Sequence, residues 1–297
     1  MSCEAFEMDK RQLTGILLLV IALQILPVSD TLAKHLSASL PVLQVIWARF
    51  FFHCLATGLY SSWRYGPRLL LPTVSWVLTA RSAALFFAVA LFYVAIHQMP
   101  LTTALTLWFV EPFLLTILAM LVFKEKVAPL QWLAIAVGFL GIVLAIRPSA
   151  DNWQWSYLIG LGAGMGYAVF LLLTRVVESK IPAIVSVYQT GLVGCVLSSI
   201  AVIPVWQTPS AVQWLQLMAT GCVAASAHFL IIKAFERAQA SLLAPFTYAE
   251  VITATMLGVL VFGDVPDRWA YAGLAIIILS AIAVVPREPR REEAPQA

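Results

Sequence analysis

Three ionisable residues, Arg49, Glu111 and Glu250, occur inside long apolar stretches of the chain. A charged side chain at the centre of a lipid bilayer costs about 2.5–3.5 kcal/mol on insertion scales, so residues of this kind are functional candidates. A guanidinium presents a rigid fork of donors that suits a carboxylate or a phosphate. A carboxyl group in such a place can bind a cationic group or carry a proton. We therefore predict that these three residues contact a small solute.

Asp30 lies in the apolar stretch before that of Arg49 and is expected at a similar depth. Two interpretations of Arg49 follow. Its guanidinium can contact the solute, or it can form a structural ion pair with Asp30, because a charge inside a membrane usually finds a protein partner. The two carboxyl groups also have a structural alternative, in which each is a neutral acid bonded to a backbone carbonyl.

Aromatic and amide side chains near these charges can shape a pocket that is mostly apolar with a few polar contacts, as small-molecule sites commonly are. The expected pocket residues are Trp47, Trp108, Tyr188, Gln189 and Tyr248. Each of them can also belong to ordinary helix packing. The four histidines have no spacing typical of metal ligands and are interpreted as structural. They are His35, His53, His97 and His228.

Catalytic patterns do not accompany these residues in the sequence. It has no Gly-rich phosphate loop with Lys and Ser/Thr, no His-Glu-x-x-His helix and no Gly-x-Ser-x-Gly elbow. It also has no Asp-rich cluster that could hold magnesium. We therefore expect no enzyme activity, no cofactor and no metal. Basic residues are spread singly, so nucleic acid is not an expected partner.

Composition places the candidate residues in a membrane protein. Hydrophobic residues make up 61% of the 297 residues and charged residues 11%, whereas a soluble domain has about 25% charged residues. A helix that spans a bilayer needs about 20 apolar residues. We expect an all-α, polytopic membrane protein with ten transmembrane helices. The predicted spans are 13–34, 42–62, 77–97, 101–123, 129–147, 155–175, 182–204, 211–232, 241–262 and 268–285.

The two halves of the chain repeat each other. At a spacing of 141 residues, Lys34, Pro41 and Trp47 align with Arg175, Pro182 and Tyr188, and at a spacing of 139, Glu111 aligns with Glu250 and Glu125 with Asp264. Five spans per half place the second copy upside down in the bilayer. Such inverted repeats are typical of secondary transporters, which hold the substrate between the repeats near the midplane.

This repeat sets the expected domain organisation. Residues 1–12 are a cytoplasmic segment, 13–148 the first five-helix repeat, 152–285 the second, and 286–297 a disordered cytoplasmic tail. Lysine and arginine concentrate in alternate loops, among them Arg64, Arg68 and Arg81, which indicates that both termini are cytoplasmic. We expect a monomer or homodimer, surrounded by membrane lipids, in a bacterial inner membrane.

Several motifs resemble the EamA-type members of the drug/metabolite transporter superfamily. The most specific is the stretch from Ala234 to Glu250, which reads AFERAQASLLAPFTYAE, followed by Phe262-Gly263-Asp264-Val265-Pro266. Met99-Pro100-Leu101 and Phe123-Lys124-Glu125-Lys126-Val127 are similar to the first-repeat versions of the same stretches. The resemblance implies ten helices in two repeats and alternating access that is proton-coupled, exchange-driven or facilitated.

Three further motifs are similar to the subgroup that contains bacterial S-adenosylmethionine uptake carriers, and riboflavin and amino-acid carriers share much of the pattern. These are Asp30-x-x-Ala33-Lys34, Arg49-Phe50-Phe51-Phe52 and Ala244-Pro245-x-x-Tyr248-x-Glu250. Glu111 departs from the family, whose members more often have a small or apolar residue before that proline. The resemblance implies a secondary transporter of a small polar metabolite. The alternative is a non-transporting membrane sensor or assembly partner with the same fold.

Overall fold

The computed structural model describes residues 10–66, 75–123, 129–146, 154–177, 182–238, 246 and 249–284, and all regular elements within these ranges are helical. The predicted amino-terminal segment 1–12 and tail 286–297 lie mostly or wholly outside them. The first half contains α1 (Lys10–Leu36), α2 (Val42–Tyr65), α3 (Trp76–Gln98), α4 (Leu101–Trp108), α5 (Glu111–Phe123) and α6 (Pro129–Ile146). The second contains α7 (Trp155–Val177), α8 (Ala183–Val202), η2 (Ile203–Val205), α9 (Ala211–Phe235), α11 (Glu250–Leu257), η4 (Gly258–Phe262) and α12 (Arg268–Val284).

Within these described residues, seven helices are long and apolar enough to cross a membrane. They are Lys10–Leu36, Val42–Tyr65, Trp76–Gln98, Leu101–Val122, Trp155–Thr174, Ala183–Val205 and Ala211–Phe235. Three shorter apolar helices are Ala136–Ala145, Glu250–Phe262 and Arg268–Ser280. Many large apolar side chains, such as Leu59 and Ile200, face outward. This composition and surface are those of a multi-pass membrane protein, whose solvent on most sides is lipid.

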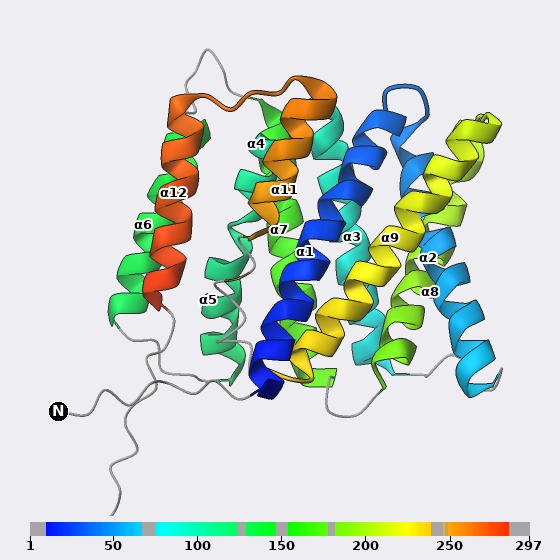
Figure 1. Cartoon of the computed structure of the whole chain (residues 1–297), viewed down its shortest axis with the longest axis horizontal. Coiled ribbons are helices and arrows are strands. Elements are labelled where there is room, and N and C mark those ends of the chain that lie inside the picture. The colour runs from blue at the N-terminus through cyan, green and yellow to red at the C-terminus, as the bar shows by residue number, and fades with distance from the viewer. Residues whose placement is uncertain are drawn as a thin grey trace, which may run out of the picture.

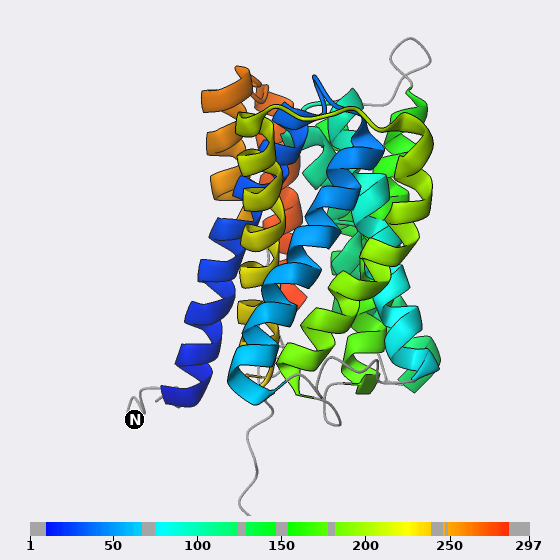
Figure 2. The same ribbon diagram turned by 90° about the vertical axis from the view of Figure 1, so that its right-hand side faces the viewer.

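Helices pair across the two halves (Figures 1 and 2). α1 packs against α9, α3 against α7, α2 against α8, and α6 against α12. In the sequence alignment of the halves, α1 corresponds to α7 and α3 to α9, so the first two pairs are the same contact made twice. Figure 1 also shows that α1 rises from the end of the bundle marked N, whereas its counterpart α7 runs the opposite way.

The predicted span 101–123 is not one helix. A turn at Phe109 and Val110 separates α4 from α5, and α5 begins at Glu111 with Pro112 as its second residue. Proline has no amide hydrogen and clashes with the carbonyl four residues before it, so a helix ends or breaks there. By contrast, α1 continues as a helix through Pro27.

Corresponding short helices in the two halves begin with a glutamate. α5 runs from Glu111 to Phe123, and α11 with η4 runs from Glu250 to Phe262. Figure 1 shows α5 in the lower half of the bundle and α11 in the upper half. Both glutamates therefore lie where these helices begin, near the middle of the bundle. Of the predicted span 241–262, residues 241–245 and 247–248 lie outside the described ranges.

Glycines on α7 allow it to approach the end of α4 closely. A methyl group added to Gly164 would lie 2.7 Å from the carbonyl oxygen of Trp108, and one added to Gly160 would lie 2.7 Å from Leu107 Cδ1. Helices in a membrane associate through such small residues because lipid offers no hydrophobic drive between them. This close packing holds the carboxyl end of α4, and with it Trp108, against α7.

Arg81 has a different environment from the one its sequence position indicated. We expected it in a cytoplasmic loop region, but it lies in α3 and its side chain is fully buried. Its Nε donates a hydrogen bond to Thr174 Oγ1 at 2.7 Å, and the guanidinium carbon lies 4.6 Å from the centre of the Phe170 ring. Arg81 therefore joins α3 to α7 through polar and cation–π contacts.

Candidate functional site

A buried pocket lies between the two halves of the chain. Residues from α1, α2, α3 and α4 line it on one side, and residues from α7, α9 and α11 line it on the other. They are Leu26, Asp30, Arg49, Leu85, Val89, Phe92, Tyr93, Leu105, Trp108, Tyr167, His228 and Glu250. The cavity volume is about 20 Å³, close to what one water molecule needs. A metabolite can enter only if the walls separate.

Arg49 is held at one end of the pocket by one of its two terminal nitrogens. Nη1 donates to Asp30 Oδ1 at 3.2 Å, to Ser29 Oγ at 3.1 Å and to Tyr93 Oη at 2.6 Å. The guanidinium also lies 5.2 Å from the centre of the Tyr93 ring. Asp30 and Ser29 belong to α1 and Tyr93 to α3, so Arg49 on α2 links three helices.

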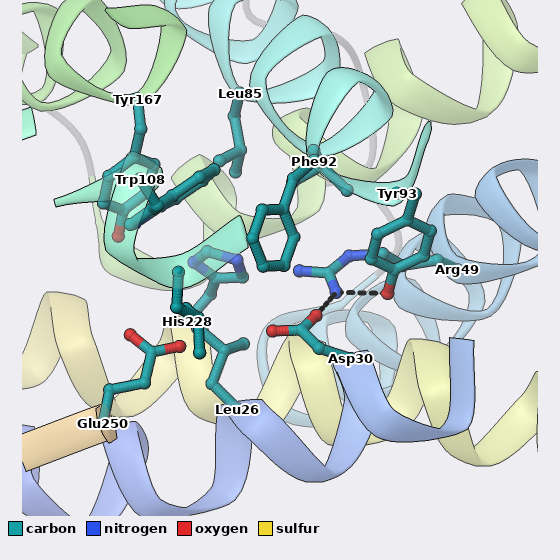
Figure 3. Close-up of a pocket in the computed structure, with 12 residues that line it drawn as sticks. Leu26, Asp30, Arg49, Leu85, Phe92, Tyr93, Trp108, Tyr167, His228 and Glu250 are labelled. Carbon is teal, nitrogen blue, oxygen red and sulfur yellow. Dashed lines mark hydrogen bonds and ion pairs between the residues drawn. The ribbon is translucent and has the colours of Figure 1, made fainter. Parts of the chain in front are cut away.

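The second terminal nitrogen of Arg49 has no hydrogen-bond partner among the described residues. Figure 3 shows it on the side of the guanidinium away from Asp30, directed toward Phe92 and the interior of the pocket. Arg49 is 3% exposed. Arg49 therefore forms the ion pair with Asp30 that one sequence interpretation gave it. Contact between its second terminal nitrogen and a bound molecule stays a prediction.

Glu250 occupies the opposite end of the pocket (Figure 3). Its side chain is 6% exposed, and its carboxylate has no hydrogen-bond or ion-pair partner within the described part of the chain. Trp108 and Tyr167 lie at the same end, with ring centres 4.6 Å apart, and Phe92 packs edge-on against Trp108 at 5.0 Å. A buried carboxylate without a partner is unfavourable, so this end of the pocket is suited to a counter-charge or a proton.

Four other predicted site residues do not line the pocket. Glu111 is buried but is not among the lining residues. Trp47 donates to Ser199 Oγ at 3.1 Å and packs against Phe51 and Trp206. Its repeat counterpart Tyr188 and the adjacent Gln189 belong to α8, which packs on α2, and neither lines the pocket. Tyr248 lies outside the described residues.

Sequence reasoning missed four polar or aromatic lining residues: Phe92, Tyr93, Tyr167 and His228. Tyr93 and His228 carry polar atoms deep within the predicted spans 77–97 and 211–232, and that depth was the available signal. The ring of His228 lies 6.0 Å from that of His53, whose Nε2 is 3.1 Å from the carbonyl oxygen of Val187. Within the described ranges, no three His, Cys, Asp or Glu side chains form a group that could hold a metal ion.

Comparison with known proteins finds matches along nearly the whole chain. The model of the EamA-like transporter family matches twice, at residues 13–147 and 154–285. The chain is 25% identical to the S-adenosylmethionine uptake transporter of Rickettsia conorii over 281 residues, which cover 95% of each protein. It is 30% identical to the riboflavin transporter of Vibrio cholerae over 197 residues, 66% of each.

Two further comparisons concern an exporter and a solved structure. The chain is 25% identical to the pseudopaline exporter CntI of Pseudomonas aeruginosa over 276 residues, 91% of this chain and 95% of the exporter. A solved crystal structure superposes with a TM-score of 0.65 at 19% identity, covering 91% of this chain and 96% of that one. At that identity the likeness concerns the fold alone.

Proposed function

We propose that this chain, which belongs to the EamA-like transporter family, is a secondary transporter of a small polar organic metabolite. It moves the metabolite across the cytoplasmic membrane of a bacterium by alternating access. Proteins similar to it over most of its length are named as transporters in several bacteria. An enzyme is disfavoured because neither the sequence nor these relatives suggest a reaction.

The observation that carries the proposal is the pocket between the two halves. A guanidinium and a carboxylate stand at its two ends and both are buried. Among the residues that the structure describes, the second terminal nitrogen of Arg49 and the carboxylate of Glu250 have no hydrogen-bond partner. Ionisable groups inside a membrane protein mark substrate or proton pathways. We propose that Arg49 contacts an anionic group of the substrate, and that Glu250 contacts a cationic group or carries a proton coupled to transport.

Alternating access follows from the proposed arrangement of two inverted repeats. The repeats exchange roles when the protein changes from one open side to the other, so the pocket is alternately exposed to the two compartments. The small cavity supports this mechanism, because the pocket must widen on one side to admit a metabolite. The pairing of α1 with α9 and of α7 with α3 supplies two equivalent surfaces for the movement.

The substrate that we propose is S-adenosylmethionine, an amino acid or a similar molecule. The Rickettsia relative is named for S-adenosylmethionine uptake, whereas other relatives are named for riboflavin transport and pseudopaline export. These relatives are named for different substrates, and one is named for uptake and another for export. The proposed substrate class therefore rests on the pocket, which suits a molecule that carries both a positive and a negative charge. Coupling is to protons or to exchange of a second solute.

Counterflow in proteoliposomes tests the proposal. Vesicles containing the purified protein are preloaded with unlabelled S-adenosylmethionine, riboflavin, single amino acids or nucleosides, and uptake of the same labelled solute is followed. We expect transient accumulation of one solute, which Arg49→Gln abolishes in protein that is still folded. If folded wild-type protein gives no counterflow with any solute but is stabilised by one of them, the chain binds without transporting, as a sensor would.

A further inference from the structure

We propose that Glu250, Trp108 and Tyr167 form a subsite for a positively charged group of the transported molecule. The substrate is then a cation or a zwitterion, and a neutral or purely anionic solute is excluded. This inference deepens the proposed transport function and rests on it. It assigns a chemical class to the pocket and gives the bound molecule an orientation within it.

The balance of charge in the pocket is the first support. Arg49 Nη1 lies 3.2 Å from Asp30 Oδ1, so the charges of these two side chains compensate each other. Glu250, also a lining residue, adds a negative charge that no cation in the described part of the chain neutralises by direct contact. When Glu250 is ionised and His228 is neutral, the pocket therefore carries an excess negative charge at the Glu250 end.

The aromatic side chains are the second support. Trp108 and Tyr167 line the same end of the pocket as Glu250, with an angle of 36° between their ring planes. The face of an aromatic ring attracts a cation, and tryptophan does so most strongly. An alkylated ammonium or sulfonium centre suits such a place, because its charge is spread over apolar groups that rings can surround. The Glu250 carboxylate thus compensates the positive charge of such a group, and the two aromatic rings pack against the apolar groups around it.

The position of Arg49 gives the orientation of the bound molecule. Its second terminal nitrogen points into the pocket from the end opposite to Glu250 (Figure 3). A zwitterion can therefore place its carboxylate against Arg49 and its cationic centre between Glu250 and the rings. A molecule without the cationic centre leaves the Glu250 carboxylate buried and unpaired, which lowers its affinity.

The test uses pairs of probes that have nearly the same shape but differ in charge. The pairs are S-adenosylmethionine with S-adenosylhomocysteine, arginine with citrulline, and choline with 3,3-dimethylbutan-1-ol, and riboflavin serves as a neutral probe. Counterflow and the rise in the melting temperature of the purified protein are measured for each. The variants are Glu250→Gln and Trp108→Leu, and the matched control is Glu236→Gln, which removes an exposed acid that pairs with Lys233.

For the pair that the wild-type protein accepts, we expect at least about tenfold faster uptake of the cationic member, the loss typical of an unmade buried charge contact. Glu250→Gln should remove this preference by slowing uptake of the cation, and Glu236→Gln should retain it. Trp108→Leu should weaken it without changing the charge of the pocket. This second variant decides the matter if Glu250→Gln does not fold.

Other outcomes overturn the inference or the function on which it rests. Equal uptake of both members of a pair, uptake of riboflavin alone, or a cation preference that survives Glu250→Gln would overturn the subsite and leave transport intact. Loss of dependence on a pH gradient in Glu250→Gln with unchanged cation preference would assign Glu250 to a proton instead. Stabilisation by cationic probes without counterflow would retain the subsite and remove the transport function. No response to any probe would remove both.

Discussion

Lys34 Nζ lies 2.7 Å from Asp264 Oδ2 and joins the end of α1 to the segment that follows η4. The ammonium also sits 4.5 Å from the centre of the Phe262 ring. Deeper along the same two elements, the Gln24 amide donates to the carbonyl oxygen of Ala249 at 2.9 Å and accepts from the Thr253 hydroxyl. α1 and α11 belong to different halves, so these contacts hold the halves together beside the pocket.

A transporter that opens between α1 and α11 has to break the Lys34–Asp264 pair. Both side chains are partly exposed, so the pair contributes about 0.5–1 kcal/mol. We expect Lys34→Gln to raise the population open on this side by about two- to fivefold. The measurement is the rate at which a water-soluble thiol reagent labels Leu26→Cys, a pocket residue, in a background without the native cysteines. These are Cys3, Cys54, Cys195 and Cys222.

The exchanged pair Lys34→Asp with Asp264→Lys is the control for this experiment. It restores the attraction with the charges reversed, and we expect the labelling rate to return toward the wild-type value. If Lys34→Gln labels at the wild-type rate, or if the exchange labels as fast as the single variant, the pair does not control opening.

The charged residues of the pocket could be located from the sequence because charge is rare in these spans. Asp30 and Arg49 were expected at one depth and are in contact, and the alignment of Glu111 with Glu250 matches two helices that each begin with one of them. The break before Pro112 agrees with the chemistry of proline, which lacks the amide hydrogen of a helix bond. Proline alone did not determine it, because α1 continues through Pro27.

The direction in which each side chain points was not readable in the same way. Most of these helices are apolar on all faces, because lipid and protein neighbours are equally apolar, so periodicity does not identify the inward face. Trp47, Tyr188 and Gln189 were chosen for their proximity in sequence to Arg49 or its repeat position, and none of them lines the pocket. Tyr93 on α3 and Tyr167 on α7 do line the pocket. Which face each of these helices turns toward the pocket is determined by packing against neighbouring helices.

Removing the charge of Asp30 should destabilise the protein strongly. Asp30→Asn leaves the Arg49 guanidinium with neutral acceptors alone, which are the new amide oxygen, Ser29 and Tyr93. An uncompensated buried charge costs about 3–5 kcal/mol. The double variant Asp30→Asn with Arg49→Gln removes both charges, so we expect it to recover the melting temperature but not transport. Normal counterflow in this folded double variant would show that Arg49 does not act on the substrate.

Tyr93 positions Arg49, and Tyr93→Phe tests this role. The change removes the 2.6 Å hydrogen bond that Nη1 donates to the phenolic oxygen. One such bond contributes about 1 kcal/mol net, so we expect the KM for counterflow to rise about fivefold with less change in maximal rate. Tyr60→Phe, at an exposed residue, is the matched control. A change in maximal rate alone would contradict a positioning role in binding.

The two repeat-related glutamates should differ in their effect on substrate affinity. Glu250 lines the pocket and Glu111 does not, so we expect Glu111→Gln to leave KM within about twofold of wild type. Glu250→Gln should raise it much more. Counterflow at a series of substrate concentrations, with both variants shown to be folded, separates the two. Equal increases in KM would mean that Glu111 also reaches the substrate in another state of the protein.

Gly164 and Gly162 on α7 provide a matched pair for the contact that holds Trp108. An added methyl group at Gly164 meets the Trp108 carbonyl oxygen at 2.7 Å, whereas at Gly162 its nearest neighbour is Leu91 Cδ1 at 3.4 Å, an ordinary contact. Overpacking against a backbone atom costs about 1–3 kcal/mol, because the helices must shift apart. We therefore expect Gly164→Ala to lower the melting temperature in detergent and to weaken substrate binding by moving Trp108 away from the pocket. Gly162→Ala should melt and bind as the wild-type protein does, and a Gly164→Ala variant that does the same would show that α4 is not positioned by its contact with α7.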